Sequence, residues 1–139
     1  MNSSFWLVLA LPEWYFGAIL DPFGAGPLSA VPAFGTLCLF VGLVLGLRRR
    51  TKGLLLFLIP AGLCEMLVAV AGAFRGQVQS SFAQPLLLGF LAVQLLISVY
   101  LIYRSKGARG AASALTLFSL TYALFASFIA VMAFTDSWL

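Results

Sequence analysis

Four long runs of apolar residues, separated by short polar loops, dominate the pattern along the chain. The runs cover about residues 28–47, 53–73, 85–103 and 111–134. At 1.5 Å per residue, a helix of about 20 residues is about 30 Å long, which matches the hydrocarbon thickness of a bilayer. The pattern therefore predicts an all-α integral membrane protein, with one membrane domain of four transmembrane helices arranged in two hairpins.

Residues 1–27 follow a different pattern, because proline and glycine repeatedly interrupt their apolar positions. We expect a short helix from Ser3 or Ser4 to Leu11, and an N-terminal interfacial or re-entrant segment on the outer side rather than a fifth span. The aromatic residues expected near the outer surface are Trp6, Trp14, Tyr15, Phe16, Phe23, Phe74, Phe82 and Trp138. At span ends they predict a belt at the lipid–water boundary, and in the N-terminal segment a docking surface for a partner.

Small residues recur at three- and four-residue spacing, which lets membrane helices approach closely. These stripes are Gly35, Cys38, Gly42 and Gly46 in the first run, Gly62, Ala69 and Gly72 in the second, where Glu65 shares their face, and Ser119, Ala123, Ser127 and Ala130 in the fourth. In the third run, Gln94 and Ser98 lie one turn apart on one face. We expect these faces to pack against other helices.

Composition and charge support the membrane interpretation. Hydrophobic residues make up 63% of the 139 positions and charged residues 9%, which is more apolar surface than a soluble domain of this size can bury. The net charge is +4, and the bases concentrate in two loops, as Arg48, Arg49, Arg50 and Lys52 and as Arg104, Lys106 and Arg109. By the positive-inside rule both loops are cytoplasmic and both termini extracytoplasmic, as in a bacterial inner (plasma) membrane. This placement argues against a nucleic-acid partner.

One acid, Glu65, lies near the centre of the second run. A charge at this depth costs several kcal/mol unless it is paired or neutralised, so we expect other helices to pack around this run. Counting along the helices places Gln94 and Tyr122 at the same depth. In a structural interpretation, a protonated Glu65 bonds to Gln94 or Tyr122 and fixes helix register, at about 0.6–2 kcal/mol. In a functional interpretation, Glu65 is a proton or cation site.

The sequence contains few of the residue types and patterns that catalysis requires. The chain has no histidine, which excludes a His-ligated haem or metal, and no nucleophile, paired-carboxylate or metal-binding pattern is present. No catalytic residue, metal or cofactor is predicted. Cys38 and Cys64 also lie at mid-depth, and two buried free thiols are favoured over a disulfide there.

Residues 12–16 read PEWYF, which resembles the PEWY motif of cytochrome b in quinol-oxidising respiratory complexes. In that family the motif lies in a loop between transmembrane helices, and its Glu hydrogen-bonds quinol at the outer site. The resemblance covers five residues and precedes the first predicted span here. It implies a quinone contact at Glu13.

These observations order three functional hypotheses. The first is a non-catalytic small subunit of a larger membrane complex, acting through helix packing and outer-face docking. The second is a small oligomeric proton or cation channel or transporter that uses Glu65. The third is a membrane redox subunit that handles quinone or lipid. The expected partners are the bilayer and either a membrane protein or further copies of the chain.

Overall fold

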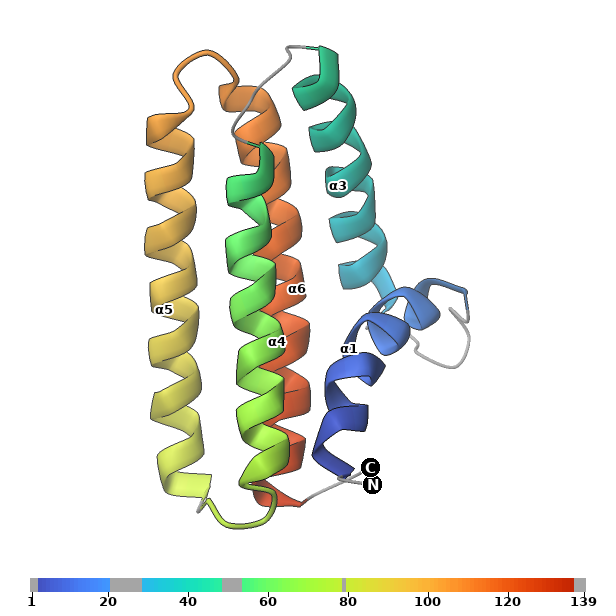
Figure 1. Ribbon diagram of the computed structural model, residues 1–139, viewed down its shortest axis with the longest axis vertical. Coiled ribbons are helices and arrows are strands. Elements are labelled where there is room, and N and C mark those ends of the chain that lie inside the picture. Colours follow the sequence, from blue (N-terminus) through green and yellow to red (C-terminus); the bar gives the residue numbers. More distant parts are fainter. Residues whose placement is uncertain (1–2, 21–28, 49–53, 79, 137–139) are drawn as a thin grey trace.

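The computed structural model describes residues 3–20, 29–48, 54–78 and 80–136, and the regular structure in these ranges is entirely helical. The elements are α1 (Ser3–Leu20), α3 (Ala30–Arg48), the 3₁₀ turn η2 (Leu54–Phe57), α4 (Leu58–Ala73), α5 (Ser80–Arg104) and α6 (Arg109–Thr135). Helices α3 to α6 run along the long axis of the molecule (Figure 1). Helix α1 covers the half of the bundle nearer the termini, below α3. The all-α prediction is confirmed for the described residues.

Three described helices, α3, α5 and α6, are long and apolar enough to cross a membrane. The prediction of four transmembrane helices is not reproduced, because the second run forms η2 followed by an α4 of 16 residues. Pro60 explains the break: it has no N–H to donate to the carbonyl of Leu56, so the chain before it winds as a tighter 3₁₀ turn. Together η2 and α4 rise about 32 Å.

Helix α6 is the central helix of the described bundle, where the second run was expected to be. It contacts α1, α3, α4 and α5. Half of its most apolar stretch, 50%, is buried, against 28% for α3 and 22% for α5. Small residues bring its neighbours close, since Ser119, Ala123, Ser127 and Ala130 are all buried along one side.

Two of the predicted small-residue stripes pack inside the chain. On α3, Gly35, Cys38, Gly42 and Gly46 are all buried, and Gly42 faces Leu115 of α6. The stripe predicted for α4 is only partly correct. Gly62 is exposed, and the fully buried positions of α4 include Cys64, Val68 and Ala71 instead. The packing face of α4 is therefore rotated away from Gly62.

Helix α1 corrects the prediction of a short helix ending at Leu11. It continues through Pro12 to Leu20 and bends along its length (Figure 1). Proline removes one helical hydrogen bond and bends a helix, but Leu11 and Tyr15, one turn apart, are both fully buried against the bundle. The burial of this face outweighs the lost bond.

Helix α5 also begins earlier than expected. It starts at Ser80 and includes Pro85, so the polar loop predicted at 74–84 is shorter. Pro85 lies near the start of the helix and removes only the bond to the carbonyl of Ser81. Gln94 and Ser98 are both buried, as their shared face predicted.

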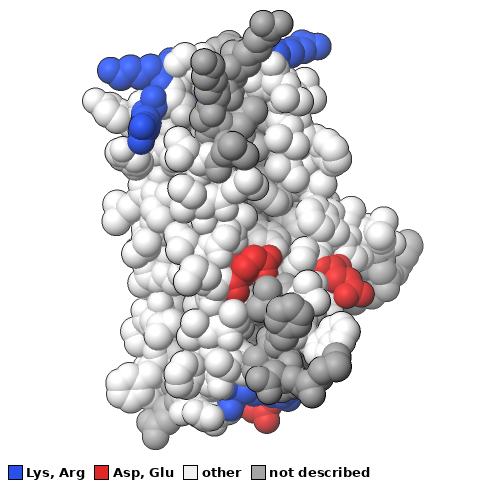
Figure 2. All heavy atoms as spheres, viewed as in Figure 1, with Lys and Arg blue, Asp and Glu red and all other residues white. Residues whose placement is uncertain are grey.

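The two ends of the bundle differ in charge (Figure 2). The basic side chains at one end belong to Arg48, Arg104, Lys106 and Arg109. At the other end, the Nε of Arg75 donates to Asp136 at 2.7 Å, in a solvent-exposed pair. Helix α1 begins and helix α6 ends at this second end (Figure 1). The predicted roles of Phe23, Arg49, Arg50, Lys52 and Trp138 fall outside the described residues.

The α4–α5 loop is joined to the end of α6 by a hydrogen bond and an ion pair. The N–H of Gly76, at φ 66°, donates to the carbonyl of Ala133 at 3.2 Å. Asp136 ends α6 in the left-handed conformation, at φ 51°, which Asp tolerates better than most residues. The ion pair with Arg75 adds up to about 1 kcal/mol at this exposed position.

Replacing Gly42 by alanine should destabilise the protein. An added Cβ would lie 2.7 Å from Leu115 Cγ and 3.1 Å from its backbone nitrogen, so α3 and α6 would have to separate. We expect a loss of about 1–3 kcal/mol in the free energy of unfolding, measured in mixed micelles. Gly62→Ala is the matched control, because nothing lies within 4 Å of its added Cβ. Equal effects of the two substitutions would contradict the close α3–α6 contact.

Candidate functional site

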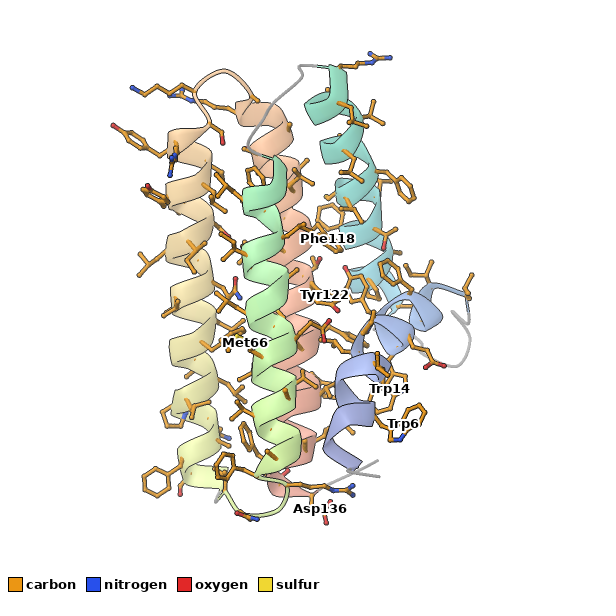
Figure 3. All side chains as sticks on the ribbon, viewed as in Figure 1. Trp6, Trp14, Met66, Phe118, Tyr122 and Asp136 are labelled. Atoms are coloured by element: carbon orange, nitrogen blue, oxygen red, sulfur yellow. The ribbon has the colours of Figure 1, made fainter. Side chains whose placement is uncertain are left out.

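A hydrogen bond between Tyr122 and Glu65 lies at the middle of the bundle. Tyr122 is at the midpoint of α6, and its hydroxyl donates to Glu65 Oε1 of α4 at 2.5 Å. Figure 3 shows Tyr122 at mid-height, between the two charged ends. The sequence predicted the same depth for these two residues, and the structure brings them into contact. The bond fixes the position of α4 against α6.

Gln94, the third predicted mid-depth residue, bonds elsewhere. Its side chain is fully buried, and its Nε2 donates to the carbonyl of Pro60 at 3.0 Å, with the Sγ of Cys64 at 3.7 Å. Of the two partners expected for Glu65, the structure therefore gives Tyr122 and not Gln94. Cys64 and Glu65 are consecutive on α4 and point about 100° apart, so Cys64 faces Gln94 while Glu65 faces Tyr122.

Tyr15 of α1 joins this layer, although the sequence predicted it near the outer surface. It is fully buried, and its hydroxyl lies 3.0 Å from Thr121 Oγ1. Because the Thr121 hydroxyl donates to the carbonyl of Phe118 at 2.8 Å, Tyr15 is the donor in this pair. The Tyr15 ring meets the ring of Tyr122 edge-on, with centroids 5.0 Å apart.

The backbone of α3 makes room for Tyr15. A Cβ on Gly35 would collide with both the Tyr15 hydroxyl and Thr121 Oγ1. Further edge-on contacts join Tyr15 to Phe118 and Phe125 of α6. The signal that could have revealed this role is the one-turn spacing of Leu11 and Tyr15, opposite the polar Glu13 on a helical wheel.

Several buried polar atoms of the bundle have no hydrogen-bond partner among the described residues. They are Thr36 Oγ1, Glu65 Oε2, Gln94 Oε1, Ser98 Oγ, Ser119 Oγ and Ser127 Oγ. Unpartnered polar groups are costly in an apolar interior, and a bound water or a proton would satisfy them. A proton or cation role for Glu65 therefore stays a prediction.

The acid of the PEWYF segment has a different setting from Glu65. Glu13 is exposed on the side of α1 away from the buried Tyr15, and Trp14 is exposed as well. Trp14 lies nearer the bundle end than Tyr122 (Figure 3). The segment thus combines a buried anchor, Tyr15, with an outward acid. A quinone contact at Glu13 stays a prediction.

The other sequence candidates divide between core and surface. Cys38 and Cys64 are buried free thiols, as predicted. Trp6, Phe74 and Phe82 are exposed, as expected for residues facing lipid or a partner. No group of three or more Cys, Asp or Glu that could hold a metal ion occurs among the described residues.

Comparison of the chain with known protein families, curated proteins and solved structures finds no match. The contacts of the mid-depth groups and the exposed face of α1 are therefore the guide to function.

The contribution of the Tyr122–Glu65 bond can be measured by a double-mutant cycle. Tyr122→Phe removes the donor and Glu65→Met removes the acceptor, so the two changes should be non-additive. We expect a coupling of about 1 kcal/mol in the free energy of unfolding in bicelles. Tyr103→Phe, at an exposed position near the basic end, should show no coupling to Glu65→Met. Additive effects of the Tyr122 and Glu65 changes would contradict the bond.

Proposed function

We propose that this chain is a non-catalytic small subunit of a larger membrane assembly, with α1 as its docking element. The observation that carries the proposal is the division of α1 into two faces. One face anchors the helix to the bundle, and the other presents large apolar and aromatic side chains outward. Because α1 is held against the bundle, its outer face is already ordered, which lowers the entropy cost of binding a partner.

The anchored face is well defined. Leu11 and Tyr15 are fully buried, and α1 contacts α3, α4 and α6. The outward face includes Trp6, 57% exposed, together with Trp14 and Phe16. Aromatic residues are enriched at the centres of protein interfaces. In contrast, most of the small-residue surfaces of α3 and α6 are used inside the chain, so we assign partner binding to α1 rather than to those stripes.

The distribution of charge supports an orientation for this subunit. The end that carries Arg48, Arg104, Lys106 and Arg109 would face the cytoplasm, by the positive-inside rule. Helix α1 and both termini would then lie on the extracytoplasmic side, in a bacterial inner membrane. The docking face would meet its partner within the outer leaflet.

A proton or cation channel or transporter is the second hypothesis. It is favoured by the buried and unpartnered Oε2 of Glu65. We rank it lower because Tyr122 already supplies a donor to this carboxyl, and the described bases lie at the two ends of the bundle. Quinone handling at Glu13 ranks third, on the motif alone.

Substitutions on the outer face of α1 should release the chain from its assembly. The combined variant Trp6→Ala and Phe16→Ala removes two exposed rings and keeps the buried Leu11 and Tyr15, although the Phe16 ring also meets the Tyr15 ring edge-on, with centroids 5.3 Å apart. We expect the tagged full-length protein to lose its stoichiometric partner on purification in mild detergent, while loss of the Phe16–Tyr15 ring contact lowers its own free energy of unfolding by no more than about 1.5 kcal/mol. Phe82→Ala, which removes an exposed ring on α5, is the matched control and should keep the partner. Retention of the partner by the α1 variant would refute the docking role.

A further inference from the structure

We propose that the outer face of α1 binds one transmembrane helix of a partner protein, and that this helix carries a Lys or Arg side chain at the depth of Glu13. The inference rests on the proposed function and names the chemistry of the partner. It follows from the spacing of the exposed residues of α1, from the depth of Glu13 and from the placement of the described bases.

Five of the exposed residues of α1 form a regular seam, and Trp14, which is also exposed, lies beside it. Residues 6, 9, 13, 16 and 20 follow one another at alternating steps of three and four, which is the spacing of a helix–helix packing seam. The seam consists of Trp6, Leu9, Glu13, Phe16 and Leu20. All five are exposed, with Leu20 at 86%. The seam runs along nearly the whole helix, on the side opposite the buried Leu11 and Tyr15.

Lipid alone does not account for this seam. Four of its residues suit lipid as well as a partner, but the fifth is an acid within the depth of the bundle. Tyr15 bonds to Thr121, beside the midpoint of α6, and Glu13 precedes Tyr15 by about 3 Å along the helix axis. Figure 2 shows two acidic groups on one face well inside the charged ends, and a third beside the basic groups of the lower end. The third is Asp136, which Figure 3 labels at that end.

No Lys or Arg among the described residues pairs with Glu13. The described bases are Arg48, Arg104, Lys106 and Arg109 at one end of the bundle and Arg75 at the other, beside Asp136. Glu13 makes no hydrogen bond or ion pair with any described residue. Acids within a membrane are usually paired, with a base or a hydrogen-bond donor. A base on a neighbouring helix satisfies this requirement, and it would also fix which partner binds and in which register.

A second copy of the chain fits the seam poorly. A symmetric dimer through this face would bring the same patch of both copies together. The two Glu13 side chains, at the centre of the seam, would then approach each other, and like charges in an apolar setting repel strongly. The charge of the seam therefore favours a different, basic partner over self-association.

Designed peptides test the proposal directly. The probes are single-span Leu/Ala helices with one central residue, Lys, Arg, Gln, Glu or Leu, reconstituted with the purified full-length chain in phosphatidylcholine vesicles. Association is measured by energy transfer between a donor on the chain and an acceptor on the peptide. We expect the Lys and Arg peptides to bind at least about tenfold more tightly than the Leu, Gln and Glu peptides.

Matched variants locate the effect. Glu13→Gln should abolish the preference for Lys and Arg, whereas Asp136→Asn, the same change at the bundle end, should retain it. Glu13 faces away from Tyr15, so its substitution should leave the unfolding of the chain unchanged. The inference is overturned if the Lys and Leu peptides bind equally, if the Gln or Glu peptide binds as tightly as the Lys peptide, or if Glu13→Gln keeps the preference. Stronger energy transfer between two copies of the chain than to the Lys peptide would also overturn it.

The result is separable from the test of the proposed function. If the peptides show no preference but the Trp6 and Phe16 substitutions still release the native partner, the subunit role stands and only the basic partner is wrong. If those substitutions leave the native assembly intact, the subunit role itself fails.

Discussion

A carboxyl at mid-depth of an apolar bundle must find its hydrogen-bond donors inside the protein, because lipid offers none. The Tyr122 hydroxyl supplies one donor to Glu65 from the midpoint of α6. This bond sets the depth of α4 against α6, and the Tyr15 ring, edge-on to Tyr122, sets α1 at the same depth. One layer of polar groups thus fixes the relative heights of three helices that non-directional apolar packing alone would leave free to slide.

The three described acids occupy three environments, and each environment suggests a different role. Glu65 points inward to Tyr122 and contributes to helix register. Asp136 lies at the bundle end, where it pairs with Arg75 and ends α6. Glu13 points outward from α1 with no partner among the described residues. Of the two mid-depth acids, Glu65 therefore makes a structural contact inside the bundle, whereas Glu13 lies on an outer surface that favours recognition of a partner.

The sequence correctly predicts the helices whose bounds are set by the length of an apolar run. Its predictions fail where tertiary packing overrides local preferences, such as the tendency of proline to end a helix. The bounds of α3 and α6 follow closely from apolar runs ended by basic or polar residues. Pro12 and Pro85 mislead as predicted boundaries, because each removes only one hydrogen bond, and packing or a nearby helix start absorbs that loss. Pro60 misleads in the opposite sense, because the predicted span runs through it, whereas the chain before it winds as a 3₁₀ turn. Only the tertiary structure distinguishes a bend, a 3₁₀ turn and an early helical turn at these three prolines.

The candidate site shows the same limit. Counting residues gives the depth of Glu65, Gln94 and Tyr122, so the layer could be predicted. Counting does not give the rotation of each helix about its axis, which decides which side chains face each other. The Glu65–Tyr122 pair and the Gln94–Pro60 pair could therefore not be told apart in advance. Tyr15 was missed because its segment read as too broken for a long helix, and the burial of its face depends on space left by Gly35 on another helix.

The central claim is that the layer of Glu65 and Tyr122 lies at the middle of a bilayer. Met66, next to Glu65 and 65% exposed on α4, reports this depth most directly (Figure 3). A nitroxide on Met66→Cys, in a chain whose native cysteines are replaced, should collide frequently with oxygen and rarely with a water-soluble nickel chelate. The same label at Phe74, beyond the end of α4, should show the reverse. Greater access of the nickel chelate at Met66 than at Phe74 would contradict the account.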